Sequence, residues 1–121
     1  MPANGPRVLG FGAHEHVAAA VQDRLRTSGM RATAIALADD AHSDDRLVAA
    51  LSADTYDVVA IGGFISGQDP QSPATMESAL WFNRVLNIVH RRAPSSLIAL
   101  VRGPANAIDD IQRVLTAHNG A

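Results

Sequence analysis

Short apolar runs alternate with segments of helical spacing along the chain. The four runs span Arg7 to Phe11, Ala32 to Leu37, Asp57 to Ile61 and Leu97 to Val101, and each gives way to glycine or acidic residues before a helical pattern begins. Such runs suit β-strands, and parallel neighbouring strands need a crossover helix between them. The pattern therefore predicts a small parallel sheet with helices on both faces.

The helical segments separate the strands and follow the last one. They are expected to cover about residues 15–28, 44–54, 73–92 and 106 onward. Ser43 or Asp44 is the expected N-cap of the second helix. Ser72 followed by Pro73 marks the expected start of the third, because proline is favoured at the first helical position. Residues 62–72 are rich in glycine and proline and are expected to be irregular.

The third run suggests the topology. It is wholly apolar from Val58 to Ile61, as expected of a central strand covered on both faces. With right-handed crossovers, the simplest strand order is 2-1-3-4, which reverses between strands one and three and leaves a crevice there. The sequence thus predicts one α/β domain over residues 1–121, a three-layer αβα sandwich of Rossmann-like or flavodoxin-like type, with residues 1–6 flexible.

Composition excludes several kinds of chemistry. All ten basic residues counted as lysine plus arginine are arginine, and cysteine is absent. Without lysine there is no P-loop or Schiff-base lysine, and without cysteine there is no thiol nucleophile, disulfide or thiolate metal site. The formal net charge of −2 gives no reason to expect a nucleic-acid partner. No apolar stretch is long enough for a membrane span and no signal peptide is recognisable, so a cytoplasmic protein is expected.

Two glycines, Gly10 and Gly12, interrupt the end of the first strand in the segment Val8-Leu9-Gly10-Phe11-Gly12-Ala13-His14-Glu15. This turn resembles the first half of a Rossmann dinucleotide fingerprint, in which glycines let a pyrophosphate approach backbone amides at a helix N-terminus. The resemblance covers about the first 40 residues and implies that Asp39, after the second strand, holds ribose hydroxyls. Glu15 stands where the third glycine is expected, and its carboxylate would repel a phosphate. A tight turn without a ligand is the alternative.

Further candidates lie in the loops around the predicted crevice. His14 suits an anion below about pH 6.5. Arg102 suits a carboxylate or phosphate, with a salt bridge to Asp69 or Asp109 as the alternative. The histidines and aspartates between His14 and His42 lack a fixed geometry, so no metal site is predicted. The complete set of predicted binding residues is Gly10, Gly12, His14, Asp39, Gly62, Gly63, Ser66 and Arg102.

The doubly wound pattern also resembles the receiver and flavodoxin-like families at the level of architecture. A phosphoacceptor receiver needs an aspartate at the end of the third strand and a later lysine, but Gly62 stands at that end and lysine is absent. A flavodoxin-like phosphate loop needs hydroxyl groups, and Gly12-Ala13-His14 has none. Receiver phosphotransfer is therefore excluded and flavin is disfavoured. The cofactor implied by the resemblance to the Rossmann fingerprint is a nucleotide or dinucleotide.

The third predicted helix is apolar around more of its circumference than one sheet-facing stripe needs. Its apolar residues are Leu80, Trp81, Phe82, Val85, Leu86, Ile88 and Val89. We therefore expect a homodimer contact through Trp81, Phe82, Val85 and Val89. Packing of the helix under the long loop is the alternative.

Two functions remain open. The first is a Rossmann-like domain that binds a nucleotide or another anionic small molecule in the crevice at the carboxyl ends of the strands. The second is a receiver-like interaction module that acts as a homodimer without a ligand. No nucleophile, base and orienting group can be assigned together, so no catalytic residue is predicted.

Overall fold

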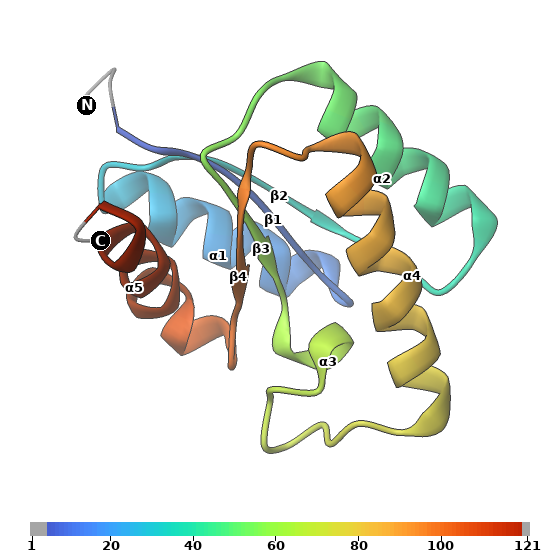
Figure 1. Ribbon diagram of the computed structural model, residues 1–121. Helices are drawn as coiled ribbons and strands as arrows, with labels where there is room; N and C mark the ends of the chain where they lie inside the picture. Colours follow the sequence, from blue (N-terminus) through green and yellow to red (C-terminus); the bar gives the residue numbers. More distant parts are fainter. Residues whose placement is uncertain (1–4, 120–121) are drawn as a thin grey trace.

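The computed structural model describes residues 5–119 as a four-stranded parallel sheet with helices on both faces (Figure 1). The strand order is β2-β1-β3-β4, which confirms the predicted α/β fold and topology. The elements follow one another as β1 Arg7–Gly12, α1 Glu15–Thr27, β2 Arg31–Ala36, α2 Ala41–Ala53, β3 Val58–Ile61, α3 Gly63–Ser66, α4 Met76–Arg92, β4 Leu97–Leu100, the 3-10 turn η1 Pro104–Asn106 and α5 Ala107–Asn119.

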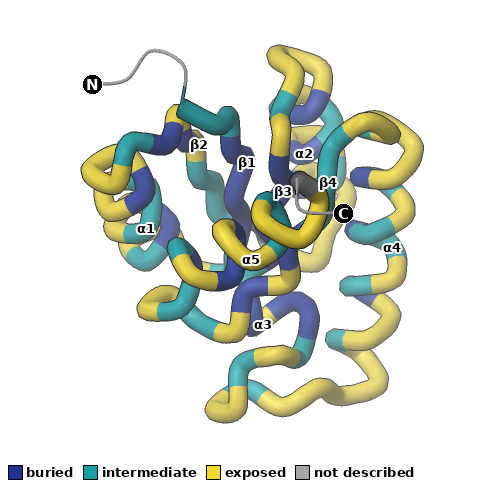
Figure 2. The backbone as a smooth tube through the Cα atoms, turned by 60° about the vertical axis from the view of Figure 1, so that its left-hand side comes forward, coloured by how far each residue is buried: buried dark blue, intermediate teal, exposed yellow. Residues whose placement is uncertain are grey.

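Alternate strand residues face the two helical layers, because successive side chains of a strand point to opposite faces. Leu9 and Ile61 belong to a core beneath α2 and α4, whereas Val8 and Val58 belong to a second core beneath α1 and α5. β1 and β3 are buried along most of their length, as central strands should be (Figure 2). The sheet therefore separates two apolar cores.

Two helices begin at residues other than those predicted. Asp40, not Ser43 or Asp44, caps α2, and its side chain accepts a hydrogen bond from the Ser43 backbone N–H at 2.7 Å. The Ser43 hydroxyl is already engaged, because it accepts from the Ala38 backbone N–H at 2.9 Å. α4 begins at Met76 rather than at Pro73, since reciprocal hydrogen bonds between Thr75 and Ser78 form a capping box there.

The segment 62–72 is less irregular than predicted. Its first part forms the short helix α3, which ends at Gly67 with a left-handed backbone at φ 78°. Glycine adopts this conformation without steric cost, so the helix stops there. α3 places residues 63–66 directly after β3, at the carboxyl end of the sheet.

The apolar residues of α4 face the protein's own core. Trp81, Val85 and Val89 lie four residues apart on one stripe and are almost fully buried against the sheet, and Phe82 is half-buried. Trp81, Val85 and Val89 are therefore not accessible to a second subunit, contrary to the expected dimer contact. The large apolar residues that α4 exposes are Met76 and Leu80.

Across residues 5–119, no helix combines the length and apolar character needed to span a bilayer. The expected flexibility of residues 1–6 falls largely on residues 1–4, which lie outside the described residues.

Candidate functional site

A hollow of about 250 Å³ lies between α1 and α5, over the carboxyl half of the sheet. We call it the α1–α5 pocket. Its walls come from Val17 and Val21 of α1 and from Ala107 and Ile111 of α5. The pocket thus lies where ligands commonly bind to open parallel sheets, next to the carboxyl ends of the strands.

The floor of the pocket is made of small residues on neighbouring strands. Gly10 of β1 pairs in register with Ala34 of β2 on one side and with Ala60 of β3 on the other. All three line the pocket. Because none carries a side chain larger than a methyl group, nothing from the sheet fills the space between the two helices.

Gly10 and Gly12 are not required by the backbone or by packing. Among residues 5–119, a positive φ occurs only at Gly29 and Gly67. A Cβ atom added at Gly10 would meet only the Ala34 Cβ, at 3.9 Å, and one added at Gly12 would meet nothing within 4 Å. These two glycines therefore keep space open at the pocket.

Glycine is required at positions 62 and 63 for a different reason, the close approach of neighbouring backbone. A Cβ atom at Gly63 would lie 2.5 Å from the Arg102 carbonyl oxygen, and one at Gly62 would lie 2.8 Å from the Phe11 carbonyl oxygen. Glycine is thus needed at both positions so that the start of α3 can approach the ends of β1 and β4.

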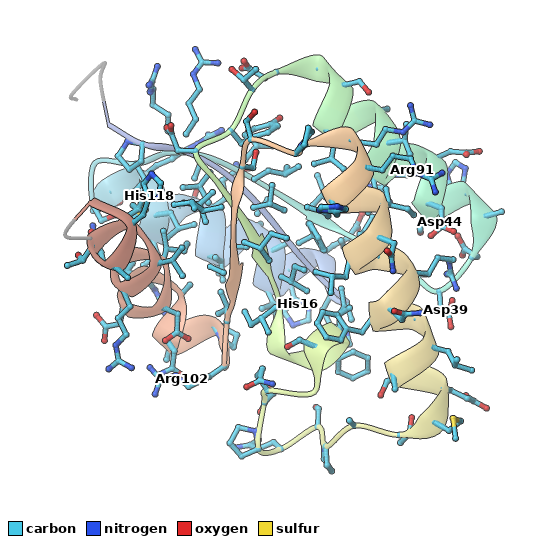
Figure 3. All side chains as sticks on the ribbon, in the orientation of Figure 1. His16, Asp39, Asp44, Arg91, Arg102 and His118 are labelled. Atoms are coloured by element: carbon cyan, nitrogen blue, oxygen red, sulfur yellow. The ribbon has the colours of Figure 1, made fainter. Side chains whose placement is uncertain are left out.

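Five of the eight predicted binding residues come together around this pocket. Those that line it are Gly10, Gly12, His14, Gly62 and Gly63, whereas Asp39, Ser66 and Arg102 do not. Figure 3 shows Asp39 beside α4 and Arg102 near the start of α5, well apart from each other. The five residues share one pocket on the α1 and α5 face of the sheet, and the three polar residues Asp39, Ser66 and Arg102 lie outside it.

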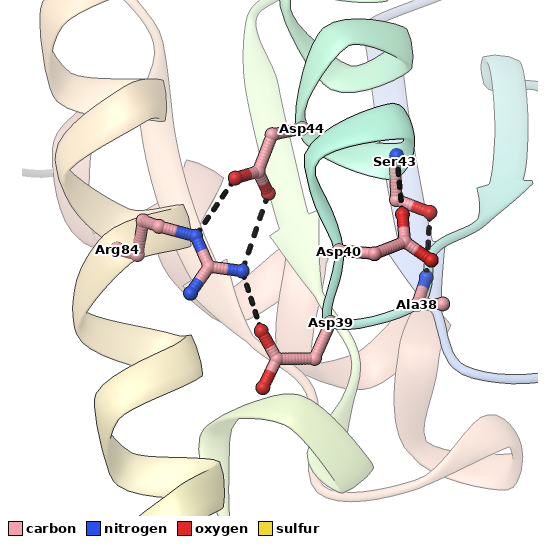
Figure 4. A network of polar contacts seen from close by, with 6 residues as sticks. All are labelled: Ala38, Asp39, Asp40, Ser43, Asp44 and Arg84. Atoms are coloured by element: carbon pink, nitrogen blue, oxygen red, sulfur yellow. Dashed lines mark hydrogen bonds and ion pairs between the residues drawn. The ribbon is translucent and has the colours of Figure 1, made fainter.

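Asp39 is held by an arginine from α4. The Arg84 guanidinium donates to Asp39 Oδ1 at 2.5 Å and to Asp44 Oδ2 at 2.8 Å (Figure 4). Hydrogen bonds to Asp39 and then to Asp44 raise the pKa of Arg84 above its ordinary value. Asp39 therefore ties the β2–α2 loop to α4, on the face of the sheet opposite the pocket.

Arg102 pairs with Asp110, whereas the alternative considered from the sequence was a salt bridge to Asp69 or Asp109. Arg102 Nη2 lies 2.8 Å from Asp110 Oδ1, and the Arg102 backbone N–H donates to Asp110 Oδ2 at 2.9 Å. Burial alone would raise the pKa of Asp110, but the hydrogen bonds from Arg102 outweigh it and keep the pKa below its ordinary value. Asp110 faces inward from the first turn of α5, whereas Asp109 faces solvent.

Ser66 forms a hydrogen bond within its own loop. Its buried hydroxyl accepts a hydrogen bond from the Gln68 backbone N–H at 3.3 Å, just after α3 ends. It is not among the residues that line the pocket.

The mouth of the pocket is formed by loop residues and an aromatic pair. The His14 and Phe64 rings pack edge to face with their centroids 5.5 Å apart, and both residues line the pocket. Asp69 and Ser72 are its other polar side chains, and the Asp69 carboxylate accepts from the Gln71 backbone N–H at 2.9 Å. Polar side chains are thus confined to the mouth, and the interior is aliphatic.

Sequence reasoning missed the helical walls of this site. The signal that could have identified them is the set of small residues at corresponding strand positions, Gly10, Ala34 and Ala60, which leaves a gap under the flanking helices. The histidines and carboxylates do not gather into a group of three or more that could hold a metal ion, within the part of the chain that the structure describes.

A second hollow of about 880 Å³ is open and lies at the amino-terminal edge of the sheet, with Arg7, Arg31, Tyr56 and His118 in its lining. None of the predicted binding residues lines it. It therefore does not contribute to the candidate site.

The chain matches no known protein-family model, and no curated protein is similar to it in sequence.

Proposed function

We propose that the protein is a binding domain that takes up a small molecule in the α1–α5 pocket. The observation that supports this most strongly is the unfilled space above Gly10. Glycine inside a strand lowers stability by roughly 0.5–1 kcal/mol relative to alanine, and the side chains around an empty space lose packing contacts. Gly10 lowers stability and the backbone conformation does not require a glycine there. Its presence is explained if a ligand occupies the space that it leaves open.

The location supports the same proposal. The pocket is concave, mostly apolar and has a few polar groups at one end, which is the usual composition of a small-molecule site. The β1–α1 and β3–α3 loops meet at its mouth, because parallel strands bring their carboxyl ends to the same edge of the sheet. No residue is assigned a catalytic role.

A filling mutation tests the proposal. A ligand that binds only the folded state and is present at about ten times its Kd should raise the melting temperature of this domain by about 6 °C. Gly10→Val should abolish that rise, because its side chain would enter the pocket. Thr33→Val is the matched control, since Thr33 is exposed on β2 and does not line the pocket. An undiminished rise in Gly10→Val would contradict the proposal.

A second candidate function is that of an interaction module that forms a homodimer. It is favoured by a difference in hydrogen bonding between the two edge strands of the sheet, β2 and β4. Side chains cover the outward backbone groups of β2: the Ala34 N–H donates to Gln22 Oε1 at 2.9 Å, and Arg26 Nε donates to the Ala32 carbonyl oxygen at 2.8 Å. The outward groups of Ile98 and Leu100 on β4 make no hydrogen bond with any described residue.

The exposed β4 edge suits pairing with a second copy. β4 consists of Leu97, Ile98, Ala99 and Leu100, with no charge or proline to prevent pairing, and Leu100 is 38% exposed. Unprotected edges of this kind pair readily with another strand. We place the candidate contact at β4, where two copies would join their sheets in antiparallel fashion, in place of the buried α4 residues.

Light scattering distinguishes this contact from one on α4. Wild type should have the mass of a dimer, and Leu100→Lys the mass of a monomer, because a charged side chain on an edge strand opposes pairing. Leu80→Lys, on the exposed side of α4, should remain a dimer. Dissociation of Leu80→Lys alone would show that the dimer contact lies on α4. A monomeric wild type would rule out the homodimer.

A further inference from the structure

We infer that the ligand of the α1–α5 pocket is a compact, uncharged and largely apolar molecule of one or two rings, with a single hydrogen-bonding group at the mouth. This inference rests on the function proposed above and names the class of ligand. It departs from the anionic nucleotide that the glycine-rich turn suggests.

The size of the pocket sets the first limit. An apolar cavity of roughly 150 Å³ takes up benzene, and pockets for drug-sized molecules span about 300–1,000 Å³. The α1–α5 pocket, at about 250 Å³, lies between these sizes. It accommodates one or two rings and is too small for the base, sugars and phosphates of a dinucleotide.

The walls set the second limit. From the floor upward, the interior is formed by Ala60, Val17, Val21, Leu25 and Ile111. Transfer of a phosphate or carboxylate into such surroundings costs many times more than transfer of a ring, because the anion loses its hydration and these aliphatic side chains offer no hydrogen-bond donor. A ring instead gains the contacts that the small floor residues leave unmade.

Charge at the mouth disfavours an anion as well. No arginine is among the described residues that line the pocket, and its one carboxylate is Asp69. Arg102 is paired with Asp110, and Arg24 Nη1 donates to the Pro104 carbonyl oxygen at 3.1 Å. α1 begins with Glu15, so the helix N-terminus already has a carboxylate in its first turn.

The mouth favours a neutral donor group on the ligand. Asp69 accepts a hydrogen bond at Oδ1 from Gln71, which leaves its carboxylate with further acceptor capacity. A hydroxyl or ring N–H at the mouth could donate to it while the ring occupies the interior. The His14–Phe64 pair lies beside this position and offers aromatic faces and edges to a planar ring.

A matched pair of probes tests the class. 2-Naphthol and 2-naphthyl phosphate share one ring system and differ in charge, and adenosine monophosphate and a nicotinamide dinucleotide represent the nucleotides. Titration calorimetry on the full chain should give 2-naphthol a Kd at least roughly tenfold lower than that of 2-naphthyl phosphate. Neither nucleotide should produce measurable heat.

Variants locate the binding. Gly10→Val should weaken 2-naphthol binding by about tenfold or more, and Thr33→Val should leave it unchanged. Ala34→Val fills the floor from the neighbouring strand and is the second variant if Gly10→Val does not fold. Asp69→Asn should narrow the difference between the two naphthyl probes, because it removes the carboxylate that repels the phosphate.

The outcomes separate this inference from the proposed function. Tighter binding of 2-naphthyl phosphate or a nucleotide, lost in Gly10→Val, would overturn the ligand class and leave the binding function intact. Binding of 2-naphthol that neither filling variant weakens would overturn both. So would the absence of binding by every probe.

Discussion

The two faces of the sheet are built from alternating residues of the same strands and each buries an apolar core, but only the face beneath α1 and α5 also holds a pocket. Beneath α2 and α4, Leu9 and Ile61 are fully buried and pack with Trp81 of α4. Beneath α1 and α5, their strand neighbours Gly10 and Ala60 leave the α1–α5 pocket. A shift of one residue along β1 thus separates a packed core from an open site.

This contrast indicates how a domain of this size can hold an open pocket. On the filled face, packing of large side chains supplies stability. On the open face, the buried core around Val8 and Val58 is joined by polar contacts at the rim of the helices: Arg24 bonds the Pro104 carbonyl oxygen, and Arg102 bonds Asp110. Such contacts position α1 and α5 without filling the space between them.

Truncation on the filled face should have the largest effect. Leu9→Ala removes a fully buried side chain and should lower the free energy of unfolding by about 2–5 kcal/mol. Urea denaturation followed by fluorescence of Trp81, the single tryptophan, measures it on the same face. Leu80→Ala is the control, because Leu80 is 61% exposed and its truncation should change stability by less than about 0.5 kcal/mol. Equal midpoints for the two variants would show that burial of Leu9 does not stabilise the filled face.

The sequence predicted the strands and their order because both depend on local pattern and on the handedness of crossovers. Val58 to Ile61 is wholly apolar, so its central position could be read directly. The loops after β1 and β3 follow from that topology, and this is why Gly10, Gly12 and Gly63 were correctly brought to one edge. These inferences needed no knowledge of how the helices rotate about their axes.

The predictions that failed depend on that rotation. Several neighbouring residues of α4 are apolar, so the sequence does not reveal that Trp81 faces the sheet while Leu80 faces solvent. The rotation of α5 likewise gives Arg102 the partner Asp110 rather than Asp109, and the approach of α4 to α2 gives Asp39 the partner Arg84. The partners in such long-range ion pairs depend on how the helices pack. The hydrophobic pattern of the sequence does not determine that packing.

Removal of a rim contact on the open face should have an intermediate effect. Asp110→Asn weakens the bonds to Arg102 and should lower the free energy of unfolding by roughly 1–2 kcal/mol at pH 7, because Asp110 is buried but Arg102 is partly solvated. Asp109→Asn, at the exposed neighbouring position, should have little effect. The measurement is the urea midpoint of each variant against wild type.

The same variant has a defined pH dependence. The pKa of Asp110 is lowered in the folded state, so the carboxylate stabilises the protein above its ordinary pKa of 3.8, and this contribution is lost as the pH falls through the folded value. The difference in midpoint between wild type and Asp110→Asn should therefore shrink as the pH falls from about 5 to about 2. A difference that stays constant over this range would show that the Asp110 charge contributes nothing.

The smallest expected effect has the opposite sign and lies one residue from Leu9. Gly10→Ala adds a methyl group that meets only the Ala34 Cβ at 3.9 Å, in an extended backbone that alanine readily adopts. It should raise the free energy of unfolding by about 0.4–1 kcal/mol, because alanine reduces the conformational freedom of the unfolded chain. Gly63→Ala should instead destabilise, since its Cβ would lie 2.5 Å from a backbone oxygen. If Gly10→Ala also destabilised the protein in urea, the space above β1 would be closed in solution, and the difference between the two faces would not exist.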